Sequence, residues 1–79
     1  MPNYEITLYG QTFKCPPNAN WIVIDEDLSV WFYEEHPEKG LIFSGWFGVR
    51  SPFIPSQHYQ KLNNPPANFD WTTELYQII

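Results

Sequence analysis

Short runs of apolar residues alternate along the chain with breaks rich in proline, glycine and acidic residues. The first run, residues 4–9, alternates apolar and polar positions and is rich in strand formers, which predicts a β-strand. Gly10 and Gln11 follow, and a glycine at the first central position is typical of a type II′ turn. Residues 12–15 then supply a return strand. The pattern therefore predicts an N-terminal hairpin.

A second pair of runs predicts the clearest hairpin of the chain. Residues 21–24 are apolar and largely β-branched, residues 25–28 form an acidic turn, and residues 29–34 return with three consecutive aromatic rings. β-Branched and aromatic side chains lose rotamer freedom against the preceding turn of a helix, so a helix is disfavoured here. We expect two paired strands over these residues.

The middle of the chain is less regular. Residues 41–47 form a third apolar run, in which Gly45 suggests a bulge or a close backbone approach. Residues 48–68 carry four prolines and predict a long irregular loop, with one helical turn near residues 56–62. Three apolar side chains are expected to hold this loop against the domain: Phe53, Ile54 and Tyr59.

The last apolar group of the chain lies within residues 68–76. Asp70 is a good N-cap for a short helix. We expect Phe69, Trp71 and Leu75 to dock this segment onto a sheet. The predicted fold is therefore mainly β: one domain over residues 1–79, with a small antiparallel sheet of about four or five strands, a long Pro-rich loop, and a short C-terminal helix or strand packed on it.

Composition limits how such a small domain can be stabilised. Aromatic residues make up 19% of the chain, and each ring buries a large area. Cys15 is the only cysteine, which excludes an internal disulfide. One cysteine and two histidines are too few for a four-ligand zinc site, so we expect no metal and no cofactor. Packing remains, with homo-oligomerisation as a further possibility.

The charge is acidic and uneven. The net charge is −5; residues 1–38 hold seven acids against one lysine, whereas residues 39–79 hold two acids against three basic residues. Clustered Lys and Arg are missing, which argues against direct binding to nucleic acid or to an anionic membrane surface. No run of about 18 apolar residues is present, and the polar N-terminus does not resemble a signal peptide. We therefore expect a cytoplasmic protein.

Two acidic motifs suggest chemistry and are better explained as solvated turns. Asp25, Asp27 and Ser29 have the first spacings of a calcium-binding loop. Val30 and His36 occupy the positions where that loop needs glycine and glutamate, so an acidic turn is the expected structure.

The second motif, Glu34-Glu35-His36, ends a strand just before a proline and is expected to be exposed rather than catalytic. Cys15 could pair with His36 or His58, but nothing in the sequence brings them together. We expect no enzymatic activity.

Two stretches resemble small accessory proteins of tailed bacteriophages. Residues 21–33 are similar to their W-x-x-x-D-x-D-G-x-V-x-x-Y hairpin, and residues 70–75 are similar to their C-terminal W-x-x-S-L element. Leu28 stands in place of the turn glycine, and Glu74 in place of the serine. The resemblance implies an accessory protein that acts in the cytoplasm of a host cell. It implies no shared activity and no site.

The aromatic and acidic residues of the second hairpin indicate a binding role. Consecutive rings on a strand point to both faces of a sheet, so either the 48–68 loop or a partner must cover one face. The acids fall just outside the strands, where burial does not account for their number. Our leading hypothesis is a protein that binds and inhibits a host defence or nucleic-acid-processing protein through a basic surface. The candidate contact residues are Asp25, Glu26, Asp27, Glu34, Glu35, Trp31 and Tyr33.

Two alternatives stay open. The first is an oligomeric sponge that binds a small ligand or nucleotide signal, with Trp46 and Phe47 as a stacking platform and Arg50 as a charged contact. The second is a virion or assembly component that pairs through its edge strands.

Overall fold

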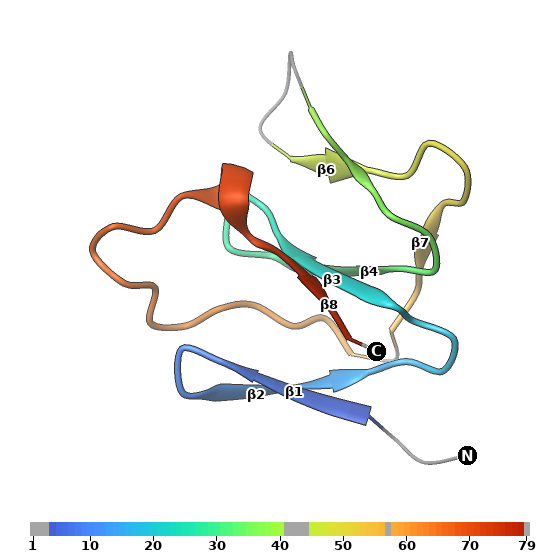
Figure 1. Cartoon of the computed structure of the whole chain (residues 1–79). Coiled ribbons are helices and arrows are strands. Elements are labelled where there is room, and N and C mark those ends of the chain that lie inside the picture. Colours follow the sequence, from blue (N-terminus) through green and yellow to red (C-terminus); the bar gives the residue numbers. More distant parts are fainter. Residues whose placement is uncertain (1–3, 41–44, 57, 79) are drawn as a thin grey trace.

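The computed structural model describes residues 4–40, 45–56 and 58–78 and is mainly β, as predicted (Figure 1). Its strands all pair antiparallel. A four-stranded sheet with the order β7-β4-β3-β8 forms the centre, and two separate two-stranded hairpins, β1-β2 and β5-β6, accompany it. The elements are β1 (Tyr4–Leu8), β2 (Gln11–Cys15), β3 (Trp21–Ile24), β4 (Val30–Tyr33), β5 (Glu38–Lys39), β6 (Trp46–Phe47), β7 (Phe53–Ile54), the 3-10 helix η1 (Trp71–Thr73) and β8 (Leu75–Gln77).

The two hairpins lie on opposite sides of the central sheet, with β1-β2 below it and β5-β6 above it in Figure 1. The main core lies between β1-β2 and the sheet. Alternate residues of β3 and β4 point into it, because successive side chains of a strand face opposite sides. Its fully buried members are Phe13, Ile22, Ile24, Phe32 and Leu62.

The first hairpin forms as predicted, but its turn lies one residue earlier. Leu8 pairs with Gln11, so Tyr9 and Gly10 are the two central residues. Both have positive φ, 54° and 76°. A type I′ turn requires positive φ at both central positions, and its twist matches that of the flanking strands. The predicted type II′ turn centred on Gly10 and Gln11 was therefore wrong.

The second hairpin agrees with the prediction. Strand β3 pairs with β4, and Val23 lies opposite Trp31. Leu28 closes the turn with φ 71°, in the left-handed region that glycine adopts most easily. Its N–H donates to the Asp25 carbonyl at 2.9 Å, and its carbonyl accepts from the Leu62 N–H at 2.9 Å. These two bonds hold a leucine in a conformation that costs a non-glycine residue about 1–2 kcal/mol.

An insertion interrupts the edge strand next to β4. Ile54 lies opposite Phe32, and Lys61 lies opposite Ser29. The two pairs are three residues apart along β4 but seven residues apart along the neighbouring segment. That segment therefore holds four residues more than a continuous β-ladder needs. We call residues 55–60 the β7 insertion; the structure describes all of them except Gln57. The described part of residues 56–62 contains no helical turn, so that prediction was wrong, because the backbone there returns to pair with β4.

The third apolar run is described only from Gly45 onward, and the part of the predicted strand at residues 41–44 lies outside the described residues. The close approach expected at Gly45 is confirmed. A Cβ added there would lie 3.1 Å from Oδ2 of Asp25, closer than ordinary van der Waals contact. Strand β6, directly after Gly45, pairs with β5.

The C-terminal segment docks onto the sheet. Asp70 caps η1, because its Oδ1 accepts from the Thr72 N–H at 3.0 Å, as the sequence predicted. Strand β8 follows at once and pairs with β3 as an edge strand. Within the described residues, the structure has no helix long and apolar enough to cross a membrane.

Candidate functional site

A short chain of hydrogen bonds links an acid to an aromatic ring at the start of β4. Asp27 accepts from the Ser29 N–H at 3.0 Å and also from the Ser29 hydroxyl. The Ser29 Oγ in turn accepts from the indole Nε1 of Trp31 at 2.8 Å. The bonds from Ser29 lower the pKa of Asp27, so this carboxylate stays ionised. The relay fixes the Trp31 ring beside a negative charge.

Trp31 forms one wall of a groove at the edge of β4. Its ring meets that of Phe53 edge to face, with centroids 4.9 Å apart and planes at 78°. Phe53 is 45% exposed and Tyr59 is 71% exposed, so both rings face solvent over much of their surface. The groove has a volume of about 200 Å³ and is lined by Val30, Trp31, Phe32, Phe53, Ile54, Pro55, Ser56 and Tyr59. We call it the β4 groove.

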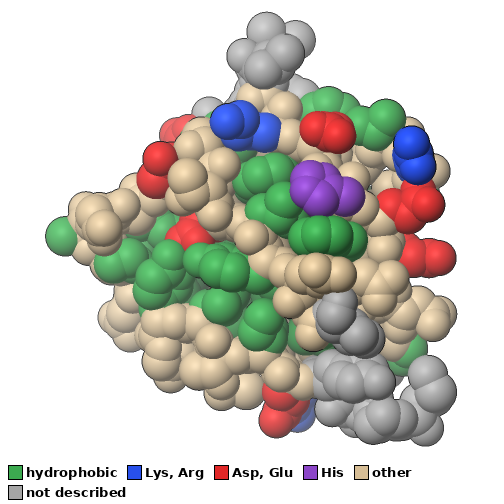
Figure 2. Space-filling model, in the orientation of Figure 1, with side chains coloured by type: hydrophobic (Ala, Val, Ile, Leu, Met, Phe, Trp, Pro, Cys, Tyr) green, Lys and Arg blue, Asp and Glu red, His purple; other side chains and the backbone are tan. Residues whose placement is uncertain are grey.

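Acidic side chains stand at both ends of β4. Glu34 and Glu35 are exposed and come directly after Tyr33, which lies opposite Phe53. Glu26 and Asp27 are exposed in the turn that precedes β4. Figure 2, seen from the β8 side, shows acidic side chains near the rim of the molecule and hydrophobic ones gathered nearer its centre and left. Four of the predicted contact acids are therefore accessible to a partner.

Asp25 is an exception among these acids, because it is half-buried. Its Oδ1 accepts from the backbone N–H of Trp46 at 3.1 Å, and Gly45 packs against the same carboxyl. Burial raises the pKa of Asp25 to about 6. The expectation that burial plays no part in this acidic group was wrong for Asp25. Its side chain joins the second hairpin to β6 and is not part of an open contact surface.

Tyr33 is also withdrawn from the predicted contact surface. Only 4% of it is exposed, and its hydroxyl donates to the Trp46 carbonyl at 3.2 Å. Burial raises the pKa of Tyr33 to about 12. The face of the sheet opposite the main core is thus covered in part by β6. The sequence left open whether the 48–68 loop or a partner covers the aromatic face of the sheet. In the structure the chain itself covers part of this face: Trp46 contacts Tyr33, and Phe53 of the 48–68 loop packs on Trp31.

The three residues of the alternative ligand site differ in burial. Trp46 is half-buried: its Nε1 donates to the Trp71 carbonyl at 3.1 Å, and the two indole rings meet edge to face at 6.4 Å. Phe47 and Arg50 are exposed. Neither the β4 groove nor the second cleft described next is lined by any of the three. Trp46 serves mainly to pack β6 on the C-terminal segment.

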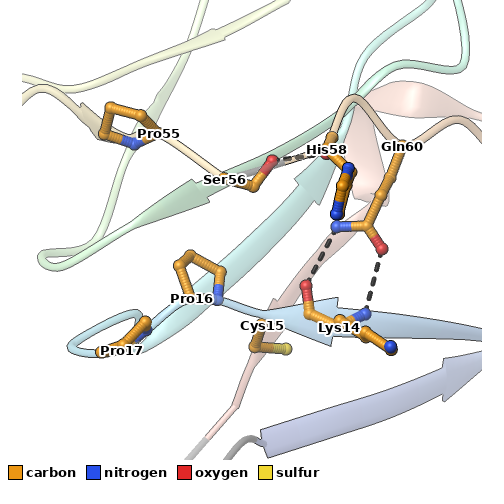
Figure 3. Close-up of a pocket in the computed structure, with 8 residues that line it drawn as sticks. All are labelled: Lys14, Cys15, Pro16, Pro17, Pro55, Ser56, His58 and Gln60. Carbon is orange, nitrogen blue, oxygen red and sulfur yellow. Dashed lines mark hydrogen bonds between the residues drawn. The ribbon is translucent and has the colours of Figure 1, made fainter.

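A second cleft of about 390 Å³ lies between the end of β2 and the β7 insertion (Figure 3). Pro55 and Ser56 stand on one side, and Pro16 and Pro17 stand on the other. Gln60 and Lys14 close one end of it through two hydrogen bonds. The complete lining is Lys14, Cys15, Pro16, Pro17, Pro55, Ser56, His58 and Gln60.

Cys15 and His58 line this cleft together, a proximity that the sequence did not indicate. The thiol is buried, and burial raises its pKa to about 11. At neutral pH it is therefore protonated and a poor nucleophile. His36 lies elsewhere, with its ring packed edge to face against Trp21 at 4.7 Å. The arrangement does not favour thiol–imidazole chemistry.

A buried carboxyl group that the sequence analysis did not identify lies just before β8. Glu74 is only 2% exposed and accepts hydrogen bonds from the hydroxyls of Tyr9 and Tyr76. Those hydroxyls also lie 3.3 Å from each other. The hydrogen bond to Glu74 raises the pKa of Tyr9, and burial with the same partner raises that of Tyr76. The cluster ties the turn of the β1-β2 hairpin to the central sheet.

Among the described residues, no group of three or more Cys, His, Asp or Glu is placed to hold a metal ion. Comparison of the chain with protein-family models, curated proteins and solved structures finds no match.

Proposed function

We propose that this chain is a small binding protein that occupies a basic surface of a partner protein and inhibits that partner. The observation that carries the proposal is the relay from Asp27 through Ser29 to Trp31. It holds an ionised acid of the turn before β4 close to an aromatic groove that is open to solvent. Such a combination suits recognition of a surface that carries both basic and apolar groups.

The two components have different physical roles. Aromatic side chains held in place lose little conformational entropy on binding, and Trp and Tyr are common among the residues that contribute most to interfaces. The acids at the ends of β4 act at longer range, because they attract a basic surface during the encounter. An acidic rim around an aromatic anchor therefore favours fast and selective association.

The biological setting comes from the resemblance of the second hairpin to accessory proteins of tailed phages. Under that resemblance the partner is a host protein. Enzymes of defence and of nucleic-acid processing carry basic surfaces that hold phosphate backbones. Occupation of such a surface by an acidic protein would exclude the nucleic acid, which makes inhibition the expected effect.

A binding role is also supported by the state of the reactive groups. The Cys15 thiol has a pKa of about 11, so little thiolate forms at neutral pH. Glu34 and Glu35 are exposed, whereas general acid–base catalysis commonly uses groups whose pKa is shifted by burial. Burial does raise the pKa of Asp25, but its carboxyl group accepts from the Trp46 N–H and lines neither of the two clefts described above. We therefore propose no catalytic residue.

The proposal is tested by capture and inhibition. The tagged protein is incubated with lysate of a bacterial host, and retained proteins are identified by mass spectrometry. We expect one partner that is released by salt and whose activity on nucleic acid falls when this protein is added. The double variant Glu34→Gln/Glu35→Gln should retain much less of it. Equal retention by the variant, or an unchanged activity of the partner, would contradict the proposal.

A second candidate, the small-ligand sponge, is favoured by the volume of the cleft in Figure 3. At about 390 Å³ it falls within the range of small-molecule sites, roughly 300–1,000 Å³. This site differs from the Trp46, Phe47 and Arg50 platform that the sequence suggested. A sponge would copurify with a small molecule that denaturation releases. Mass spectrometry of the released fraction separates the two functions.

A further inference from the structure

We infer that the β4 groove receives an arginine side chain from a basic segment of the partner protein. This inference rests on the proposed function and names the chemical group that the surface recognises.

The groove exists because the edge strand leaves β4. Between Ile54, opposite Phe32, and Lys61, opposite Ser29, the chain holds four residues more than a continuous ladder needs. Pro55, Ser56 and Tyr59 of the β7 insertion form the outer wall, and β4 forms the inner wall. The concavity is thus built into the pairing of the sheet, next to a rigid strand.

The aromatic rings suit a flat cation. Trp31 and Phe53 stand nearly perpendicular at 4.9 Å, which creates a corner of two ring surfaces, and Tyr59 adds a third ring with most of its surface exposed. A cation within about 6 Å of a ring centroid is attracted by the negative face of the ring. Guanidinium is planar and weakly hydrated and stacks on such faces better than ammonium does, so arginine is favoured over lysine.

The surrounding charge favours the same ligand. Glu34 and Glu35 follow the strand at one end, and Asp27 is held next to the Trp31 indole at the other. Lys61 lies close enough to Asp27 to help lower its pKa, so it offsets part of that charge. The two exposed glutamates add to the attraction for an approaching cation.

The volume argues for a side chain rather than a cofactor. At about 200 Å³ the β4 groove lies below the range of roughly 300–1,000 Å³ that is usual for small-molecule sites. One large side chain is a suitable occupant. The segment that carries it would extend across the exposed acids.

The test uses short peptides and two-dimensional NMR. The probe is the capped pentapeptide Gly-Ser-Arg-Ser-Gly, with citrulline as a neutral isostere and norleucine as an apolar counterpart. We expect the arginine peptide to shift the indole signal of Trp31 and the ring signals of Phe53 and Tyr59. Its affinity should exceed that of the citrulline peptide by about threefold or more, the range of an exposed cation–π contact.

Matched variants locate the effect. Phe53→Leu and Tyr59→Leu should each weaken arginine-peptide binding by about twofold or more. Val49→Ala shortens an exposed apolar side chain that does not line the groove, and it should leave binding unchanged. Well-dispersed amide spectra verify that each variant is folded. Equal affinity for the three peptides, or shifts confined to residues outside the groove, would overturn the inference.

The outcome is separable from that of the proposed function. If a partner is captured through the acids but groove variants bind it normally and the peptide causes no shifts, the inference fails and the proposed function stands. If the arginine peptide binds in the groove but no partner depends on the acids, the inference stands and the proposed function fails.

Discussion

The side-chain amide of Gln60 pairs with the backbone of Lys14 as a neighbouring strand would. Its Oε1 accepts from the Lys14 N–H at 3.0 Å, and its Nε2 donates to the Lys14 carbonyl at 2.9 Å. Gln11 repeats the arrangement in the other direction: it donates to the Lys61 carbonyl at 2.8 Å and accepts from the Asn63 N–H at 2.9 Å. Two glutamines thus join the β1-β2 hairpin to the segment that carries the β7 insertion.

Replacement of Gln60 by Ala should therefore destabilise the domain. Two hydrogen bonds to backbone groups are lost, and each is worth about 0.5–1.5 kcal/mol. Since 1 kcal/mol shifts the Tm of a domain of this size by about 4–8 °C, the loss is readily measured by thermal unfolding. Gln77→Ala, at an exposed glutamine of the edge strand β8, serves as the control. Equal melting temperatures for the two variants would contradict this role of Gln60.

Because the pKa of Asp25 is raised in the folded protein, we expect this residue to make the domain less stable as pH rises. Its pKa is about 6 in the folded protein, whereas its ordinary value, taken for the unfolded chain, is 3.8. Between these two pH values the folded state therefore binds more protons than the unfolded state. The contribution of Asp25 to stability therefore falls as pH rises from about 4 to about 6. Asp25→Asn keeps an oxygen that can accept from Trp46, so we expect a higher Tm at pH 7 and a flatter profile across this window.

Asp27 provides the opposite case in the same turn. Its pKa is lowered by the bonds from Ser29, so its stabilising effect is present above its ordinary pKa and is lost as pH falls through the lower, folded value. Asp27→Asn should therefore lower the Tm at pH 7, where Asp25→Asn raises it. Thermal melts of the two variants across pH 4–7 test both signs. A lower Tm for Asp25→Asn at pH 7 would show that its carboxylate stabilises the fold.

The buried carboxyl group of Glu74 should make the domain sensitive to loss of either tyrosine hydroxyl that donates to it, one from Tyr9 in the first hairpin and one from Tyr76 in β8. Tyr9→Phe removes a donor to a carboxyl group that is almost completely buried, and a buried acceptor left without its partner costs about 1–3 kcal/mol. Tyr76→Phe should cost a similar amount. Chemical denaturation gives the free energy of unfolding. The control is Tyr59→Phe, because this hydroxyl belongs to a residue that is 71% exposed, and it should be nearly neutral. A cost at Tyr9 no greater than at Tyr59 would rule out this anchoring role.

The sequence predicted the local hairpins because their signals are local. Residues 21–24 and 30–33 are β-branched and aromatic, and they pair in the expected way around the acidic turn. The position of the first turn was predicted wrongly, because it depends on the positive φ of Tyr9. That choice follows from the twist of the finished hairpin rather than from the residue itself.

Contacts between distant segments could not be predicted. The Gln60–Lys14 pair joins residues 46 positions apart. No periodic pattern in the sequence indicates that a glutamine side chain will bond the backbone of a strand as a neighbouring strand would. The burial of Asp25 depends on where β6 packs, and the β4 groove depends on four residues that leave the ladder. Exposed acids and Trp31 were identified from sequence as binding candidates, whereas Phe53 and Tyr59 were seen only as residues that pin a loop.

The central claim, that exposed acids beside the β4 groove direct this protein to a basic partner, is tested most directly by association kinetics. Glu34→Gln/Glu35→Gln is compared with Glu5→Gln/Glu38→Gln, which removes the same charge from exposed positions on β1 and β5. Binding of each to the captured partner is followed at low and high salt. We predict that the first variant associates several-fold more slowly at low salt and shows a flatter salt dependence, since long-range attraction acts mainly on the encounter. The control should remain close to the wild type. An equal change in both variants, or no change in either, would contradict the claim.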